Sequence, residues 1–343
     1  MSVLPTIAIV GATGAVGREA LSILAERAHP SDRVLAFASE RSSGRTIDYA
    51  DGVLPVRTLT KGALCTADIA IFASSAEVSR EYVPEAAASG VVCIDNSSAF
   101  RADPRARLVI PEVNGHELDR LPESRIFANP NCSTILLLVA LEPLRRAFGI
   151  ERVIVSTYQA VSGAGLAGME ELRSQARAYP DDPAPEPRVF PQSCLFNCFV
   201  HESPLDPLTG FNGEEQKIVS ETRRIWGLDG PVPVVPTCVR VPVLRAHCES
   251  VFVRLEHAAT LEEVRTMFAS APGLALDDGS DSVTPRRASG ADDILIGHLR
   301  SAGPVGEPNR EFAFWLSGDQ LRKGAALNAL QIAERVMAQP MSV

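Results

Sequence analysis

The chain has 343 residues, of which 45% are hydrophobic and 22% are charged, and its net charge is −9. This length accommodates two domains, and the composition is typical of a soluble globular protein. The acidic charge argues against nonspecific nucleic-acid binding, which depends on basic surface, and no apolar run approaches the roughly 20 residues of a membrane span. We expect neither nucleic acid nor membrane as a partner. Because the N-terminus lacks a basic leader, we expect a cytoplasmic location.

The first expected element is a short strand, TIAIV, at residues 6–10, followed by the loop GATGAVG and a helix-like segment at residues 18–27. In dinucleotide-binding units, such glycines permit close approach of a pyrophosphate, whose charge the helix N-terminus stabilises. The spacing, GxxGxxG, is a variant of the usual fingerprint, and a plain turn is the alternative. The residues expected to contact the cofactor here are Gly11, Thr13, Gly14, Ala15, Val16 and Gly17.

Further short strands are expected at residues 33–38, 68–72 and 91–95, with helical segments between some of them. This alternation predicts a parallel sheet. The second strand ends in ASERSSG, where an acidic residue would bind the ribose of NAD and a basic residue would accommodate the phosphate of NADP. Ser39, Arg41 and Ser42 favour NADP, Glu40 keeps NAD possible, and a solvated polar loop is the alternative.

Cys132 lies in NPNC, directly before an apolar run at residues 135–141 that is typical of a buried helix. Turn and cap residues precede it, so we expect Cys132 near a helix N-terminus, where the dipole and unpaired N–H groups favour a thiolate. The thiolate is the nucleophilic form of cysteine. The alternative is a packing role, because free cysteine is among the most buried residue types.

The second half of the chain predicts an α+β domain with strands at residues 153–158 and 250–255. Proline and turn residues predict loops at residues 179–187 and 277–293. Residues 323–336 predict a C-terminal helix. The expected fold class is therefore α/β: a Rossmann-type parallel-sheet domain at residues 1–131, completed by residues 322–343, and an α+β catalytic and dimerisation domain at residues 132–321. The active site is expected in the cleft between them.

The seven cysteines form no regular framework, so we expect reduced thiols. Cys194, Cys198 and His201 offer three nearby metal ligands, but without a second cluster packing is the better interpretation. No metal site is expected.

A series of motifs resembles the aspartate-semialdehyde dehydrogenase family in order along nearly the whole chain. The motifs are GATGAVG (11–17), SSAFR (97–101), PEVN (111–114), NPNC (129–132), TYQAVSGAG (157–165), NGEEQK (212–217), CVRVPVLRAH (238–247) and GAALNALQIAE (324–334). The resemblance implies the reversible, NADP-dependent interconversion of aspartyl phosphate and aspartate semialdehyde, with phosphate as a co-substrate. It also implies a homodimer or a dimer of dimers.

The resemblance assigns roles residue by residue. It makes Cys132 the nucleophile, His247 the acid-base residue and Gln159 a residue that orients the substrate. Glu214 is matched to the substrate amino group and Arg240 to its carboxylate, while the residues matched to phosphate are Arg101, Asn131 and Lys217. The remaining cofactor residues are Ser162, Gly163 and Asn328.

Each of these roles has a structural alternative. Glu214 and Lys217, three positions apart, would share a helix face as an ordinary ion pair. Asn328 and His247 could be buried hydrogen-bonding groups. Arg240 and His247 are seven positions apart and would share a face if the segment were helical, whereas a strand at residues 239–243 would require a bend.

Two other functions remain open from the sequence. N-acetyl-γ-glutamyl-phosphate reductase uses similar cysteine and histidine chemistry, and a catalytically silent NADP-binding relative would act as a partner subunit. Glu214 favours a substrate with a free amino group, and the presence of both Cys132 and His247 argues against a silent relative. The region 194–213 departs from the usual family form, which leaves its contacts unassigned.

Overall fold

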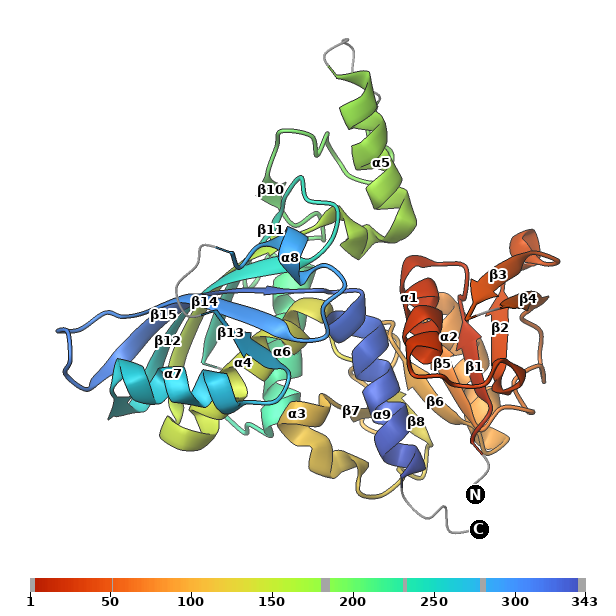
Figure 1. The fold of residues 1–343 in the computed structure, drawn as a ribbon, viewed down its shortest axis with the longest axis horizontal. Helices are drawn as coiled ribbons and strands as arrows, with labels where there is room; N and C mark the ends of the chain where they lie inside the picture. The colour runs from red at the N-terminus through yellow and green to blue at the C-terminus, as the bar shows by residue number, and fades with distance from the viewer. Residues whose placement is uncertain (1–3, 51, 180–185, 231–232, 278–281, 339–343) are drawn as a thin grey trace. The chain divides into compact units, whose positions relative to one another are not determined.

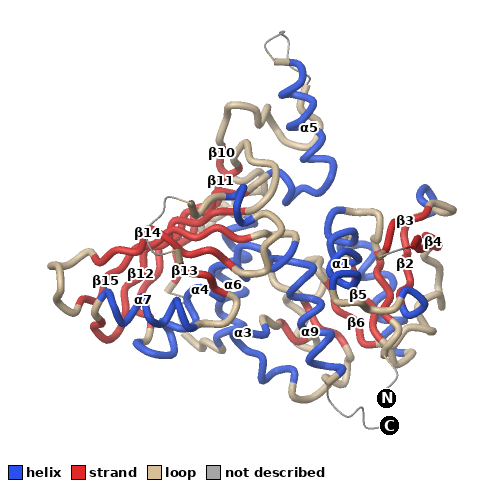
Figure 2. The backbone as a smooth tube through the Cα atoms, in the orientation of Figure 1, coloured by secondary structure: helices blue, strands red, loops and turns tan. Residues whose placement is uncertain are grey.

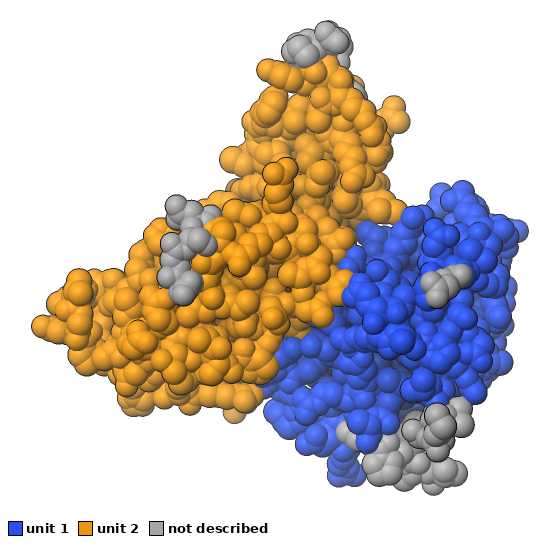
Figure 3. All heavy atoms as spheres, in the orientation of Figure 1, with its two compact units in different colours: residues 1–131, 325–343 blue, residues 132–324 orange. Residues whose placement is uncertain are grey.

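The computed structural model describes residues 4–50, 52–179, 186–230, 233–277 and 282–338. The chain forms two compact units, coloured separately in Figure 3: unit 1 comprises Met1–Asn131 and Ala325–Val343, and unit 2 comprises Cys132–Gly324. Each unit is built on a β-sheet with helices packed against it (Figure 1 and Figure 2). In the described part of the chain, no helix is both long and apolar enough to cross a membrane.

The sheet of unit 1 has the strand order β3-β4-β2-β1-β5-β6-β8-β7. Every neighbouring pair is parallel except β3 and β4, which confirms the predicted parallel sheet. Its central strands are short, apolar and buried, as expected where helices cover both faces. The strands are β1 (Ile7–Val10), β2 (Val34–Ala38), β3 (Thr46–Tyr49), β4 (Gly52–Thr58), β5 (Ile69–Phe72), β6 (Val92–Asp95), β7 (Arg107–Leu108) and β8 (Ile126–Ala128).

The helices of unit 1 include the element that begins in the glycine-rich loop and the element at the C-terminus. They are α1 (Ala15–Glu26), α2 (Ala76–Ala88), α3 (Pro111–Asn114) and α9 (Leu327–Met337), with 3₁₀ turns η1 (Ser31–Arg33), η2 (Glu40–Ser42) and η3 (Gly115–Leu118). One apolar cluster joins α1, α9 and the sheet through residues such as Leu21, Ile71 and Leu330. The C-terminal helix therefore completes the core of unit 1.

Two predicted boundaries differ from the structure. Helix α1 starts at Ala15, inside the glycine motif, and not at residue 18. The chain returns to unit 1 at Ala325 and not at residue 322, because Arg322–Ala326 forms a separate π-helical turn, η5, before α9 begins at Leu327.

The sheet of unit 2 has the order β10-β11-β9-β12-β15-β14-β13 and mixes parallel and antiparallel pairs. The predicted strands at residues 153–158 and 250–255 lie within β9 and β12. The strands are β9 (Ile150–Gln159), β10 (Phe199–Val200), β11 (Val234–Arg240), β12 (His247–Ala259), β13 (Leu274–Leu276), β14 (Ile294–Ser301) and β15 (Asn309–Gly318).

The helices of unit 2 are α4 (Cys132–Phe148), α5 (Gly165–Ala178), α6 (Gly213–Trp226), α7 (Leu261–Ser270) and α8 (Pro285–Ala288), with the 3₁₀ turn η4 (Val161–Ala164). Helices α4 and α6 pack against each other and against the sheet. Helix α5 projects away from the sheet (Figure 1), and Val161, Leu172, Phe190 and Cys194 form a small apolar cluster at its base.

The two predicted loops fall partly outside the described residues. Residues 180–185 of the first and residues 278–281 of the second belong to that part. The described remainder of the second contains the short helix α8, which Pro285 begins and the Thr284 side chain caps.

Candidate active site

Cys132 is the first residue of α4 and is partly exposed. The prediction of a helix N-terminus at this cysteine is confirmed. Other cysteines are buried, and burial raises the pKa of Cys93 to about 12, raises that of Cys248 to about 11 and also raises that of Cys238. A helix N-terminus and access to solvent are the conditions that favour a reactive thiolate.

Gly324 allows the backbone of η5 to approach Cys132 closely. A Cβ placed on Gly324 would lie 3.0 Å from the Cβ of Cys132 and 3.3 Å from the Cβ of Gln320. Such contacts are tight, so any side chain at Gly324 would press on the cysteine. The π-helical turn thus limits the space on one side of Cys132, and π-bulges occur frequently at functional sites.

His247 is the first residue of β12 and is fully buried. Its Nε2 lies 3.5 Å from the Sγ of Cys132, and its Nδ1 accepts a hydrogen bond of 3.1 Å from the backbone N–H of Ala160. A nitrogen that accepts a hydrogen bond carries no proton, so the proton of the neutral ring must be on Nε2. The ring therefore presents an N–H donor to the sulfur.

Burial and charge both keep this imidazole neutral. Removal from solvent lowers the pKa of His247 to about 3, and the nearby Arg240 guanidinium adds to the effect. Protonation would also place a second N–H opposite that of Ala160. The pair formed by Cys132 and His247 is consequently a sulfur beside a neutral hydrogen-bond donor at neutral pH.

The helical alternative for the segment from Arg240 to His247 is wrong. β11 ends at Arg240 and β12 begins at His247, so the strand alternative with a bend is correct. The bend passes through Ala246, which has a φ of +71° and donates its N–H to Gln320 Oε1 at 2.8 Å. Pairing of β11 with β9 holds the segment extended.

Gly163 lies against both ends of this bend. A Cβ on Gly163 would be 3.1 Å from Arg240 Nη1 and 3.7 Å from His247 Nε2. A glycine at this position leaves room for a ligand to approach the arginine and the histidine. The neighbouring Ser162 accepts a hydrogen bond from the side-chain amide of Gln320. Both residues were predicted to contact the cofactor, and the structure places them in η4, with Gly163 beside Arg240 and His247.

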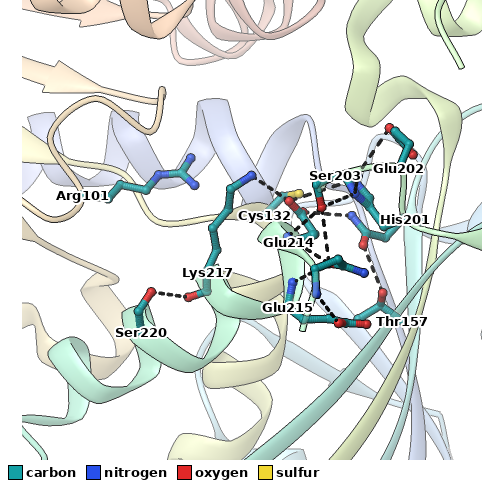
Figure 4. Close-up of polar contacts among 12 residues, drawn as sticks. Arg101, Cys132, Thr157, His201, Glu202, Ser203, Glu214, Glu215, Lys217 and Ser220 are labelled. Carbon is teal, nitrogen blue, oxygen red and sulfur yellow. Dashed lines mark hydrogen bonds and ion pairs between the residues drawn. The ribbon is translucent and has the colours of Figure 1, made fainter. Parts of the chain in front are cut away.

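Gln159 and Glu214 are joined by a buried hydrogen bond. Gln159 ends β9, donates from Nε2 to Glu214 Oε1 at 3.2 Å, and accepts at Oε1 from the Thr157 hydroxyl at 3.1 Å. Lys217 Nζ lies 2.8 Å from Glu214 Oε2, so the two share one face of α6 as predicted. Figure 4 shows this group at the start of the helix. The glutamate is buried, which distinguishes the pair from a solvated surface ion pair.

The start of α6 is fixed by a capping box. Asn212 accepts from the backbone N–H groups of Glu214 and Glu215, and Glu215 accepts from the N–H of Asn212. The second carboxylate oxygen of Glu215 accepts the N–H of Cys238 on β11 at 3.0 Å. These bonds hold Glu214 in place relative to the strand that carries Arg240.

Arg240 is buried and its guanidinium already contacts a carboxylate. Nη2 and Nε lie 2.7 and 3.4 Å from the two oxygens of Glu202, and Nη1 donates to the Ala160 carbonyl at 2.9 Å. Nη2 also lies 3.0 Å from His201 Nε2. The sequence did not assign Glu202, because its proximity to Arg240 arises from the pairing of β10 with β11.

The three residues for which packing was preferred over a metal site have different surroundings. Cys194 packs in the apolar cluster at the base of α5, Cys198 is exposed, and His201 contacts Arg240. Packing is therefore the correct interpretation for Cys194 alone. Within the described ranges, no group of three or more His, Cys, Asp or Glu residues is arranged to hold a metal ion.

Three of the predicted substrate and cofactor residues, Arg101, Asn131 and Asn328, lie in the remainder of unit 1. Arg101 donates from Nε to the Asn129 carbonyl at 2.9 Å and from Nη2 to the Asn96 carbonyl at 2.8 Å. Asn131 is buried at the end of the unit. The Asn328 amide donates to the Val109 carbonyl at 3.1 Å and to Asn129 Oδ1 at 2.6 Å, so this side chain has a clear structural role.

The glycine-rich loop has the shape that a dinucleotide phosphate requires. Gly11 has a φ of +85°, and a Cβ there would lie 2.3 Å from the Ala73 carbonyl oxygen. A Cβ on Gly17 would lie 2.2 Å from the Gly11 carbonyl oxygen. The N-cap Gly14 provides no side-chain cap, and the first turn of α1 contains no acidic residue. The N-terminus of α1 therefore suits an anion, and the loop residues fit a pyrophosphate.

The end of β2 carries the predicted specificity residues for the ribose. Ser39 is the N-cap of η2, which contains Glu40, Arg41 and Ser42. The side chains of Ser39, Glu40 and Arg41 are exposed. An exposed Arg41, with Ser39 and Ser42 nearby in the sequence, suits a ribose phosphate, whereas the adjacent Glu40 would suit the ribose hydroxyls of NAD.

Two families of domains match the chain. The family described as semialdehyde dehydrogenase, NAD binding domain, matches residues 6–121, and the family described as semialdehyde dehydrogenase, dimerisation domain, matches residues 141–323. Together they cover most of the two units.

Full-length relatives carry one name. The aspartate-semialdehyde dehydrogenase of Aquifex aeolicus is 41% identical over 340 residues, covering 97% of this chain and 98% of the relative. Aspartate-semialdehyde dehydrogenase 2 of Vibrio cholerae is 42% identical over 330 residues, covering 96% of each chain. The crystal structure of aspartate semialdehyde dehydrogenase II from Vibrio cholerae complexed with ASA matches with a TM-score of 0.92 and 41% identity, over 98% of this chain and 99% of that one.

These matches agree with a cysteine at a helix N-terminus beside a buried histidine, and with a glycine-rich loop that fits a dinucleotide. The chain belongs to the aspartate-semialdehyde dehydrogenase family.

Proposed function

We propose that this protein catalyses the NADP-dependent, reversible reductive dephosphorylation of L-aspartyl 4-phosphate to L-aspartate 4-semialdehyde, a step of amino-acid biosynthesis. The observation that supports it best is the contact of 3.5 Å between Cys132 Sγ and His247 Nε2. Such a contact suits covalent catalysis by a thiol. Phosphate and the amino acid derivative are the small-molecule partners.

The reaction begins with Cys132. Its sulfur attacks the acyl carbon of the phosphorylated substrate, the bond from that carbon to the phosphate oxygen breaks, and a thioester on Cys132 remains. NADPH, when bound, supplies a hydride for the thioester carbon. The carbon–sulfur bond then breaks, the aldehyde leaves, and the sulfur takes up a proton to complete the cycle.

His247 acts at the sulfur as a hydrogen-bond donor. Its Nε2–H stabilises negative charge on the sulfur when the carbon–sulfur bond forms or breaks. Service as a general base would require the ring to lose its hydrogen bond from the Ala160 N–H, because the proton would have to move to Nδ1. Of the predicted acid-base role, this geometry therefore supports hydrogen-bond donation by His247 to the sulfur, and not proton removal from it.

The substrate groups are assigned to charged residues of opposite sign. Glu214 would bind the amino group and Gln159 would orient the acyl group beside it. Arg240 would bind the carboxylate, for which a planar guanidinium is suited. The family resemblance assigns Lys217, Arg101 and Asn131 to the phosphate.

The cofactor assignment rests on the fit of the loop. The residues that would hold the pyrophosphate are those of the glycine-rich turn, namely Gly11, Thr13, Gly14, Ala15, Val16 and Gly17. Ser39, Arg41 and Ser42 would bind the ribose phosphate that distinguishes NADP from NAD. Ser162 and Gly163 are assigned to the nicotinamide end of the cofactor. Asn328 is assigned to the same end, and its amide donates a hydrogen bond to Asn129 Oδ1.

A homodimer would use the outer face of the unit 2 sheet. Register places Val235, Ile154 and Phe252 side by side, with Val239 and Tyr158 in a parallel row. Ile154, Tyr158 and Val235 are 43%, 37% and 41% exposed, which is unusual for large apolar groups in the middle of a sheet. A second copy of this face would cover them. A Tyr158→Glu variant that still sedimented as a dimer would contradict this interface.

We place the enzyme in the cytoplasm, where a catalytic thiol stays reduced. None of the described cysteines is in a disulfide.

The reaction is tested by following NADPH absorbance when the protein meets aspartate semialdehyde, phosphate and NADP. We expect phosphate-dependent reduction of NADP that is lost in Cys132→Ala. Turnover of N-acetylglutamate semialdehyde alone would instead identify the longer acylated substrate. Absence of turnover with either, in a folded protein that binds NADP, would favour a silent relative.

A further inference from the structure

The carboxylate-binding edge of Arg240 is occupied by another part of the chain. Its Nε and Nη2 atoms, which form the edge that a carboxylate binds in a two-pronged contact, lie 3.4 and 2.7 Å from the oxygens of Glu202. Nη1 donates to the Ala160 carbonyl. A substrate carboxylate that used the same edge would have to take the place of Glu202.

The two partners of this ion pair are held to different degrees. The side chain of Arg240 is 3% exposed, whereas that of Glu202 is 24% exposed. The arginine is also fixed by Ala160 and by the Phe190 ring, whose centroid lies 5.2 Å from Cζ. Glu202 lies two residues after the short strand β10, and its side chain is the more exposed of the two. The carboxylate is therefore the exchangeable member of the pair.

Glu202 stands beside the residue proposed for the amino group. The ring nitrogen Nε2 of His201 lies 3.8 Å from Glu202 Oε1 and 4.0 Å from Glu214 Oε2. Figure 4 shows the two glutamates on either side of this histidine. Burial disfavours ionisation of Glu202, but the Arg240 guanidinium outweighs it, so the pKa of this carboxyl lies below its usual value. The site thus holds a carboxylate anion where the substrate anion is expected.

We infer that Glu202 is a specificity-determining residue, an internal carboxylate that competes with the substrate carboxylate for Arg240. The inference rests on the proposed function, because that function gives Arg240 its ligand. It deepens the proposal by predicting that the substrate carboxylate contributes less binding free energy than it would if the Arg240 guanidinium had no internal partner. The wild-type enzyme consequently discriminates less strongly against a substrate that lacks this carboxylate than an enzyme without the Glu202 carboxylate would.

Steady-state kinetics with two aldehydes test the competition. Aspartate semialdehyde carries the carboxylate, and 3-aminopropanal is the same aldehyde without it. For Glu202→Gln, we expect kcat/KM for aspartate semialdehyde to rise roughly threefold to thirtyfold, mainly through a lower KM, while kcat/KM for 3-aminopropanal stays unchanged. Glu202→Ala should act in the same direction.

The control is Glu262→Gln on α7, which removes one negative charge from an exposed side chain elsewhere in unit 2. It should leave both substrates unaffected. An equal loss for both aldehydes in the Glu202 variants would show that Glu202 merely supports Arg240. An unchanged ratio between the aldehydes would also overturn the inference.

A second measurement does not depend on the reaction. Iodoacetate and iodoacetamide alkylate Cys132 with the same chemistry, but only iodoacetate carries a carboxylate. The ratio of their rates at the Cys132 peptide, followed by mass spectrometry, should rise severalfold in Glu202→Gln and stay constant in Glu262→Gln. An unchanged ratio in Glu202→Gln would contradict the inference. A raised ratio in a protein that does not turn over aspartate semialdehyde would instead show that the proposed function has failed while the competition for Arg240 is real.

Discussion

Two buried polar groups lie two residues apart on strand β12, and their surroundings differ completely. His247 at the start of the strand contacts Cys132 through Nε2 and the Ala160 N–H through Nδ1. Glu249, on the same face of the strand, is also fully buried, but neither of its carboxylate oxygens has a hydrogen-bond partner among the described residues. Strand pairing places it between Thr157 and Leu316.

This difference shows that burial affects a polar side chain differently when hydrogen-bond partners are present and when they are absent. At the start of β12, the contacts with Cys132 and Ala160 fix the tautomer and position of His247, which is the arrangement that the proposed function requires. In the interior, burial alone raises the pKa of Glu249 well above its usual value, because removal from solvent disfavours the charged carboxylate. The partnered group should matter for turnover and the unpartnered one for stability.

The largest effect is expected at the partnered end. His247→Asn removes the donor at the sulfur and should lower kcat about a hundredfold to ten-thousandfold. Because burial holds the pKa of His247 at about 3, the wild-type profile of kcat/KM should show no inflection near pH 6.5 from this group. Steady-state rates between pH 5 and pH 8 check both points. An inflection near pH 6.5 that disappears in the variant would show that the ring titrates as an ordinary histidine.

A smaller effect is expected from crowding the nucleophile. Gly324→Ala places a methyl group 3.0 Å from the Cys132 Cβ and should lower kcat roughly tenfold to a hundredfold, because a small displacement of the attacking sulfur lowers the rate strongly. Gly230→Ala is the matched control, since a Cβ there meets no atom within 4 Å. Both variants are assayed alongside the rate of thiol alkylation. Equal activity of the two would mean that η5 does not position the cysteine.

The smallest effect concerns the unpartnered carboxyl. In the folded protein Glu249 keeps its proton above the pH at which the unfolded chain loses it, so wild-type stability should fall as pH rises from about 4.5. Glu249→Gln does not titrate. Its free energy of unfolding should exceed that of the wild type by on the order of 1 kcal/mol at pH 8, and the difference should shrink at pH 4.5. Denaturant unfolding at the two pH values measures it.

A pH-independent difference between these two proteins would contradict the raised pKa of Glu249. An increased difference at low pH would mean that the carboxylate has a cationic partner in solution.

Local patterns were sufficient for much of this fold. The apolar strands and the glycine-rich loop of unit 1 could be predicted from the local sequence, because turn, strand and helix signals follow one another within a few residues. Cys132 was placed correctly for the same reason, since the turn before it and the apolar run after it are adjacent in the sequence.

Long-range pairing accounts for what the sequence did not reveal. Arg240 and His247 have helical spacing, yet the pairing of β11 and β12 with β9 makes the segment two strands joined by a bend. Glu202 meets Arg240 only because β10 pairs with β11. Neither contact leaves a signal in residue spacing. The orphaned Glu249 likewise becomes apparent only when its neighbours on adjacent strands are known.

The thioester on Cys132 is the central claim, and it can be observed directly by mixing the enzyme with aspartate semialdehyde and NADP in the absence of phosphate. We predict a burst of about one NADPH per active site and an aspartyl group on the peptide that contains Cys132. Added phosphate should release this group as aspartyl phosphate and convert the burst into continued formation of NADPH. A burst without modification of Cys132, or an acyl group on another residue, would contradict the account.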